Sequence, residues 1–319
     1  MIEVVRAGIL TTVQDLGRPG WRASGVPLGG ALDSMALRVA NAVVGNEDSA
    51  AGLECTVRGP VLRFLSPARI AVAGAGVEGV AGRRVLDIEA GAEVSLEGIV
   101  RGGRVCLAVA GGIDVPLVMG SRSTHLAGGF GGHEGRALRA GDRLAIGRGG
   151  SPASRTHERW SVSPEMVPDV NDDTQVFRVL AGPQHDWFDD AARRTFWEGP
   201  FAVTAMSDRM GLRLSGQAVP RSESREMISA PIALGSVQVP PDGQPIVLLA
   251  DCQTLGGYAQ IAVVISADIP RLARLRPGQW VRFEQVSLVE AQYHRRAMDT
   301  AYAALRAGLA EKTMHHGEP

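Results

Sequence analysis

The sequence predicts a mainly β fold arranged in two domains. The chain has 319 residues, and at roughly 150 residues per domain this length favours two. Glycine supplies 40 residues, about one in eight against a usual share of roughly 7%, which favours many tight turns. Short apolar runs are separated by Gly, Pro or Asp about every 8–12 residues, a spacing typical of β-barrels and β-sandwiches.

The expected strands are short and the expected helices are few. Asp33 can cap a helix over residues 34–44. A second helix is expected over 186–197 and a short one after Asp268. A long helix is expected over 288–309, where apolar residues recur with helical spacing. The expected strands are 61–65, 69–73, 94–96, 105–110, 176–180, 236–239, 246–250, 261–266 and 280–283.

The domain boundary is expected between residues 147 and 173, where Gly, Ser, Pro and charged residues occur with little periodicity. Weak similarity between residues 140–144 and 277–281 is compatible with a duplicated β unit, and equally with two unrelated segments. The expected organisation is a first domain at 1–150, a linker at 151–173, a second domain at 174–287, a C-terminal helix at 288–310 and a tail at 311–319.

Composition excludes several classes of function. Lys plus Arg is 33 and Asp plus Glu is 34, so the balanced charge argues against nucleic acid as a partner. The single lysine, Lys312, excludes a P-loop lysine and a biotin-bearing lysine in an ordered carrier domain. Cys55, Cys106 and Cys252 form no C-x-x-C pair, which argues against disulfides and zinc and favours the cytoplasm. No apolar stretch is long enough for a membrane span.

Two motif-like segments are interpreted as structural. Residues 74–79 read GAGVEG, a G-x-G-x-x-G pattern, but no helix is expected after them to bind a pyrophosphate. They predict a glycine hairpin and no dinucleotide site. His125, His133 and Glu134 lie around four glycines that orient none of them, so we expect a polar loop and no metal site.

Three segments carry candidate functional residues. Arg122, Ser123 and Thr124 follow a glycine, and a guanidinium among hydroxyls suits a carboxylate or phosphate; the alternative is a solvated turn. Asp208 and Arg209 follow a β run and form either a substrate-orienting pair or a structural ion pair.

The third segment, residues 235–258, is the most informative. Two apolar strands are joined by a diproline turn, and polar residues follow the second strand beside a Gly-Gly turn. A tight barrel corner explains the glycines but not these polar residues, so we favour a ligand site. Its candidate residues are Gln238, Asp251, Gln253, Thr254, Gly256, Gly257 and Tyr258.

Seven segments together carry a resemblance over nearly the whole chain. They are residues 10–20 (LTTVQDLGRPG), 25–33 (GVPLGGALD), 107–116 (LAVAGGIDVP), 120–124 (GSRST), 207–211 (SDRMG), 238–245 (QVPPDGQP) and 251–258 (DCQTLGGY). In this pattern the chain resembles the biotin-dependent carboxyltransferase family, also called allophanate hydrolase subunit 2. That family includes the C subunit of 5-oxoprolinase and a Kip-type antagonist of a sporulation-kinase inhibitor.

The resemblance implies two cyclophilin-like β-barrel domains and a partner of the allophanate hydrolase subunit 1 type, called the B subunit. For a 5-oxoprolinase it also implies an A subunit, ATP at the level of the complex, and conversion of 5-oxo-L-proline to L-glutamate, which is the activity we expect. The alternatives are carboxyl transfer from biotin to urea or another small amide, and non-catalytic binding of a kinase inhibitor. The family usually has Pro after Gly-Gly-Tyr, where this chain has Ala259, so Tyr258 is less constrained.

Lactam opening needs a carboxylate clamp, a charge stabiliser and a base. Arg122 or Arg209 is expected to bind the substrate carboxylate or a phosphate. Asp208 or Asp251 is expected to orient the reacting groups or to take a proton from one of them. The expected catalytic residues are Asp208, Arg209, Asp251 and Gln253, and the expected substrate-binding residues are Arg122, Ser123, Thr124, Gln238, Thr254, Gly256, Gly257 and Tyr258.

Overall fold

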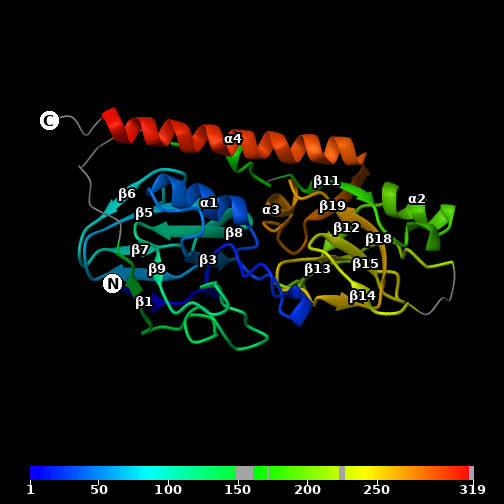
Figure 1. Cartoon of the computed structure of the whole chain (residues 1–319), viewed down its shortest axis with the longest axis horizontal. Coiled ribbons are helices and arrows are strands. Elements are labelled where there is room, and N and C mark those ends of the chain that lie inside the picture. Colours follow the sequence, from blue (N-terminus) through cyan, green and yellow to red (C-terminus); the bar gives the residue numbers. More distant parts are fainter. Residues whose placement is uncertain (149–160, 171, 223–226, 316–319) are drawn as a thin grey trace. The chain divides into compact units, whose positions relative to one another are not determined.

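The computed structural model describes residues 1–148, 161–170, 172–222 and 227–315, and within them the predicted mainly β fold is confirmed. The chain divides into two compact units (Figure 1). Unit 1 comprises Met1–Arg18, Gly29–Asp169 and Met298–Pro319. Unit 2 comprises Pro19–Leu28 and Val170–Ala297. Residues 19–28, expected in the first domain, therefore group with the second unit.

Unit 1 contains two five-stranded sheets. The first has the order β7-β4-β1-β10-β9, with β1 Ile2–Arg6, β4 Val61–Phe64, β7 Glu93–Ser95, β9 Ile113–Asp114 and β10 Arg143–Ile146. The second has the order β2-β3-β8-β5-β6, with β2 Leu10–Gln14, β3 Gly52–Thr56, β5 Ala68–Val77, β6 Leu86–Ile88 and β8 Ile99–Val109. Apolar side chains from both sheets form one buried core.

The second sheet of unit 1 is buried on both faces because α1 (Ser34–Val43) packs on β5 and β8 (Figure 1). Along β5, Ile70 and Val72 belong to the core of the sheets, whereas Ala71 and Ala73 belong to the cluster around α1. This alternation follows from the two-residue period of a strand. Asp33 caps α1 as predicted, since its carboxylate accepts a hydrogen bond from the Ala36 N–H.

The helix α4 (Leu288–His315) supplies part of the α1 cluster through its second half. Tyr302 is buried there, its hydroxyl donates to Asp48, and the Arg38 guanidinium lies 3.8 Å from its ring centroid. The helix continues past residue 310, where a tail was expected, because no glycine or proline follows before Gly317.

Unit 2 is built around a closed barrel of seven strands in the order β11-β18-β15-β16-β13-β12-β19. A parallel pairing of β11 with β19 closes it, and the other neighbours are antiparallel. The strands are β11 Thr174–Ala181, β12 Phe201–Val203, β13 Gly211–Ser215, β15 Ser236–Val239, β16 Ile246–Leu248, β18 Ala259–Val264 and β19 Trp280–Gln285. A two-stranded sheet pairs β14 (Ala230–Pro231) with β17 (Leu255–Gly256).

Aromatic side chains fasten the main helix of unit 2 to the barrel. Phe196, on α2 (Asp190–Glu198), stacks on Phe283 of β19 with 4.8 Å between ring centroids. A second short helix, α3, covers Ile269–Leu272, as expected after Asp268. The helix predicted from residue 186 starts four residues later because Asp189 is its N-cap, accepting from Ala192 N–H.

The segment expected as a linker is partly integrated into unit 1. Residues 149–160 and 171 lie outside the described part of the chain. The described residues include three short helical turns, at Arg22–Ser24, Pro164–Met166 and His185–Trp187. Val162 and Val167 flank the second of these and are buried in the α1 cluster, which explains why this stretch follows unit 1.

Candidate functional site

The chain turns sharply after β16, and a buried ion pair stabilises this turn. Asp251 accepts two hydrogen bonds from Arg209, from Nε at 2.8 Å and from Nη2 at 3.2 Å. The two side chains are only 4% and 5% exposed, and the Asp251 N–H also donates to the Arg209 carbonyl. We call residues 251–258, with Asp208 and Arg209, the Asp251 corner.

Asp208 precedes the buried arginine but is itself exposed. One oxygen of its carboxylate accepts from the N–H groups of Met210 and Gly211, at 2.8 and 3.0 Å. Within the described part of the chain its second oxygen has no hydrogen-bond partner. The Asp251 corner thus contains one buried carboxylate, Asp251, and one exposed carboxylate, Asp208.

The glycine at position 256 is required by a close approach of β17 to the barrel. A Cβ built there would lie 2.6 Å from the Gln238 Nε2 and 3.3 Å from Ile232. Gln238 is 1% exposed, and its Nε2 has no hydrogen-bond partner among the described residues. Gln238 was predicted to bind substrate, but it is buried against Gly256 and shielded from solvent.

Three of the residues predicted in segment 251–258 are exposed to solvent. Gln253 and Gly257 are exposed, and the Tyr258 side chain is 44% exposed. Thr254 is half-buried, and its carbonyl accepts from the Ile232 N–H. These groups offer an amide, a phenol and a glycine peptide as hydrogen-bonding partners.

Arg22 also belongs to this part of unit 2, and no sequence motif pointed to it. It donates a hydrogen bond to the Ile232 carbonyl and lies beside the Cys252 thiol. Burial raises the pKa of Cys252, and the Arg22 guanidinium opposes that rise. Only folding shows this contact, because the two segments are far apart in sequence.

In unit 1, the hydroxyls expected to bind a ligand bind the chain's own Asp15. Its Oδ1 accepts from the hydroxyls of Ser121 and Ser123, at 2.7 and 2.5 Å, and from the Gly17 N–H at 2.7 Å. Its Oδ2 accepts from the Arg122 N–H at 2.5 Å. We call these five residues the Asp15 network. These hydroxyls and N–H groups thus bind an internal carboxylate, and the bond from Arg122 comes from its backbone and not from its guanidinium.

The remaining groups of that segment are also engaged. The Arg122 Nε donates to the Val115 carbonyl, and its Nη2 lies 3.6 Å from an Asp114 oxygen. Thr124 is fully buried and its hydroxyl donates to the Val13 carbonyl. Ser123 and Thr124 therefore stabilise the fold, and Arg122 retains partial exposure only through its side chain.

The structure agrees with the expected absence of a helix after the glycine motif, since β5 runs into a turn and then β6. In the part of the chain that is described, no group of three His, Cys, Asp or Glu side chains could hold a metal. No described helix is long and apolar enough to cross a membrane.

Comparison with known proteins connects this chain to characterised relatives. The model of the carboxyltransferase domain, subdomain A and B, matches residues 24–285. The C subunit of 5-oxoprolinase from Escherichia coli K12 is 44% identical over 297 residues, which cover 91% of this chain and 93% of that protein. The same-named protein of Haemophilus influenzae is 35% identical over 98% of this chain and 100% of its own length.

Among solved structures, the urea amidolyase of Kluyveromyces lactis superposes with a TM-score of 0.88 at 30% identity. The match covers 95% of this chain but 20% of that larger protein. These sequence and structural matches agree over nearly the full chain. The chain belongs to the carboxyltransferase domain, subdomain A and B, family.

Proposed function

We propose that this chain is the C subunit of an ATP-dependent 5-oxoprolinase, which opens 5-oxo-L-proline to L-glutamate together with the A and B subunits. The observation that carries the proposal is similarity, over at least 91% of this chain, to two proteins named as the C subunit of 5-oxoprolinase. The urea amidolyase relatives are matched over only about a fifth of their length. The proteins named as the C subunit are instead matched over 93% and 100% of their own length.

ATP is proposed to bind on another protein of the complex. The glycine motif of β5 leads into a turn and not into a helix N-terminus, so it does not form a phosphate cradle. The sequence has no lysine before Lys312. The glycine motif therefore does not fit a nucleotide-phosphate site, and no P-loop lysine is available to complete one. Biotin belongs only to the alternative activity.

In the assembled complex, the Asp251 corner is proposed to bind and orient the lactam. Gln253, Tyr258 and the Gly257 peptide are exposed there and can hydrogen-bond the ring amide or an oxyanion that develops on it. Asp208, which is exposed and directly precedes Arg209, is proposed to take the proton from the attacking water. Arg209 and Asp251 are positioning residues, because each is occupied by the other.

The test is to co-purify the chain with its B-subunit homologue, add the A subunit, and screen ATP hydrolysis with 5-oxoproline, urea and allophanate. We expect ADP release that depends on 5-oxoproline and forms glutamate. Urea-dependent carboxyl transfer from added carboxybiotin would replace the proposal with the carboxyltransferase activity. A stable complex without either activity, in which the chain still binds a kinase inhibitor, would support the non-catalytic alternative.

A further inference from the structure

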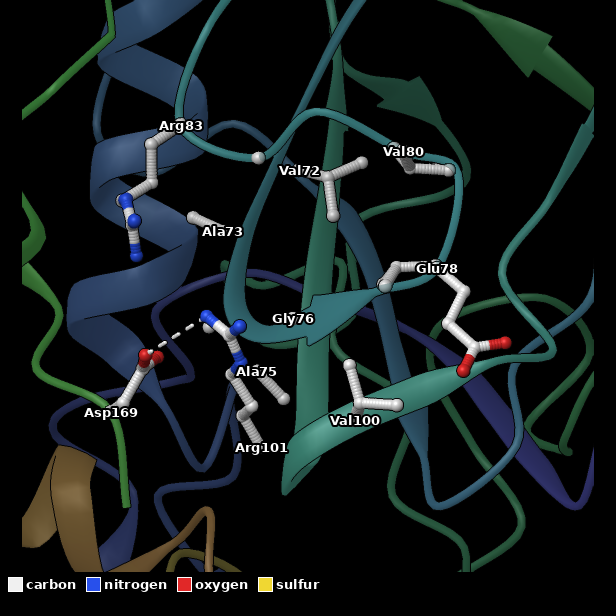
Figure 2. A pocket seen from close by; sticks show the side chains of 13 residues that line it. Val72, Ala73, Ala75, Gly76, Glu78, Val80, Arg83, Val100, Arg101 and Asp169 are labelled. Atoms are coloured by element: carbon white, nitrogen blue, oxygen red, sulfur yellow. Dashed lines mark ion pairs between the residues drawn. The ribbon is translucent and has the colours of Figure 1, made fainter. Parts of the chain in front are cut away.

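A cavity of about 340 Å³ lies in unit 1, where the glycine motif that the sequence analysis interpreted as a hairpin forms one wall. It is bounded by the end of β5, the following turn and the start of β8 (Figure 2). Its size is that of a small-molecule site. Most of its wall is apolar, from Val72, Ala73, Ala75, Val77, Val80 and Val100.

Two arginines stand at one end of this cavity. Figure 2 shows the guanidinium groups of Arg83 and Arg101 on the same side, with Glu78 extending at the other side. Within the described residues, Arg83 has no carboxylate at ion-pair distance, and its buried Nε has no hydrogen-bond partner. Arg101 has one long ion pair, 3.8 Å to Asp169. The cationic end is therefore incompletely neutralised.

The backbone holds both arginines in an uncommon conformation. Arg83 has φ of 58° and Arg101 has φ of 56°, in the left-handed region that disfavours side chains with a Cβ. Only five non-glycine residues of the described chain share this conformation. Such strain persists where the surrounding structure enforces it, and it gathers at functional sites.

Strand pairing is also interrupted at the cavity. The register of β5 with β8 shifts between Gly74 and Gly76, so that Gly76 pairs with Val100 and Ala75 is skipped. A Cβ at Gly76 would lie 3.3 Å from Val100 and 3.8 Å from the Arg101 Cδ. The missing side chain thus keeps the space beside Arg101 open.

We propose that this cavity binds a small organic carboxylate, whose carboxylate group lies between the guanidinium groups of Arg83 and Arg101. Planar guanidinium groups match a carboxylate in shape and charge. Asp169 already places one carboxylate beside Arg101, and a ligand would compete with it. The apolar valine and alanine walls suit an organic body and give a bare inorganic anion no contact.

The experiment is isothermal titration calorimetry of the full chain with three probes. The first is 5-oxo-L-proline, and only this choice of probe rests on the proposed function. The second is 2-pyrrolidinone, the same ring without the carboxylate, and the third is inorganic phosphate. We expect binding of 5-oxo-L-proline alone. Phosphate binding of equal strength, or equal binding of 2-pyrrolidinone, would overturn the proposal, as would no binding of 5-oxo-L-proline.

Variants locate the bound carboxylate. Arg83→Gln and Arg101→Gln should each weaken binding about tenfold or more, because each removes a charge-assisted hydrogen bond. Asp169→Asn should strengthen binding severalfold, because it removes the competing carboxylate. Arg84→Gln is the matched control: it removes a neighbouring charge whose buried Nε also lacks a partner, but Arg84 does not line the cavity.

Each variant is first checked for an unchanged thermal unfolding midpoint. If Arg83→Gln and Arg101→Gln bind 5-oxo-L-proline as the wild type does, or if only Gln253→Ala loses binding, the carboxylate does not lie in this cavity and the proposal is overturned. The proposed function fails separately, through absence of glutamate from the assembled complex. Binding that depends on Arg83 in a chain without that activity would leave the cavity site standing.

Discussion

The Asp15 network in unit 1 and the Asp251 corner in unit 2 each hold one buried carboxylate, but they hold it with different groups. Asp15 is bound by two hydroxyls and two peptide N–H groups. Asp251 is bound through its two oxygens by the Arg209 guanidinium. The first set consists of neutral donors, and the second is a buried ion pair.

The surroundings of the two carboxylates differ as well. The serines of the Asp15 network are fully buried, so none of its hydroxyls can meet a ligand. The Asp251 corner leaves Asp208, Gln253 and Tyr258 at the surface. The two segments look alike in sequence, with polar residues beside glycines, but their roles differ. The hydroxyls of the first bind a buried carboxylate, whereas the polar groups of the second are exposed to solvent.

The largest expected effect comes from neutralising each carboxylate. Asp251→Asn should lower the free energy of unfolding by about 3–5 kcal/mol, because the buried Arg209 charge loses its counter-charge. Asp15→Asn should cost about 1–2 kcal/mol, because its neutral donors keep one acceptor oxygen. Urea denaturation at neutral pH measures both. Equal losses at the two positions would contradict the distinction between a neutral network and an ion pair.

A paired replacement is the control for this prediction. Arg209→Met combined with Asp251→Leu should recover most of the stability lost by Asp251→Asn, because no charge remains buried. If the double variant regains stability but not activity, the ion pair is needed to position Asp208. Continued instability would mean that the loss came from packing and not from an unpaired charge.

The next effect separates function from stability. Gln253→Ala and Tyr258→Phe should change the free energy of unfolding by less than about 0.5 kcal/mol, because both side chains are exposed. In the assembled complex they should lower kcat/KM for 5-oxoproline about 10- to 100-fold. Ser121→Ala, in the Asp15 network, should do the reverse and lower stability by about 1–2 kcal/mol. Unchanged turnover in both corner variants would show that the corner is scaffold.

A smaller effect extends the comparison to Asp142, a mostly buried carboxylate with an arginine partner. The hydrogen bond from Arg136 holds the pKa of Asp142 well below its usual range. A lowered carboxyl pKa stabilises the fold above the unfolded-state value near 4, and this contribution is lost as the pH falls towards the folded-state value. Asp142→Asn should therefore lower the free energy of unfolding by about 1–2 kcal/mol at pH 7. The difference in unfolding free energy between variant and wild type should become smaller by pH 2. Urea titrations at several pH values check this, and a constant difference would refute it.

The smallest effect concerns the thiols of the two units. Burial raises the pKa of Cys55 to about 12, and burial also raises that of Cys252. Neither should react with iodoacetamide in the native protein at pH 8, and both should react after denaturation. Mass spectrometry of the alkylated peptides shows which of the two cysteines has reacted. Rapid native alkylation of Cys252 alone would mean that the Asp251 corner opens in solution.

Local features were predictable from sequence because they depend on neighbours in the chain. The Asp33 cap, the α1 stripe and the strand-forming runs each follow from a short period or from a single capping side chain. The corner at 251–258 was recognisable because polar residues followed an apolar strand beside glycines. The ion pair of Arg209 with Asp251 could not be predicted from the sequence, because each residue taken alone is also compatible with a catalytic role.

Long-range partners could not be predicted, because they form only when the sheets assemble. Nothing local marks Asp15 as the carboxylate that Ser121 and Ser123 bind, more than 100 residues later. In the same way, Arg22 meets Ile232 only through folding of unit 2. The cavity arginines were missed because the glycine motif was judged against a dinucleotide site, and Arg101 carries no motif of its own.

The most direct test of the central claim is glutamate formation by the complex of the A and B subunits with either the wild-type chain or its Asp208→Asn variant, at matched assembly. The account predicts glutamate and ADP in equal amounts with wild type, and a loss of about 100-fold or more with the variant. Equal turnover by the two, or no glutamate from a fully assembled wild-type complex, would contradict it.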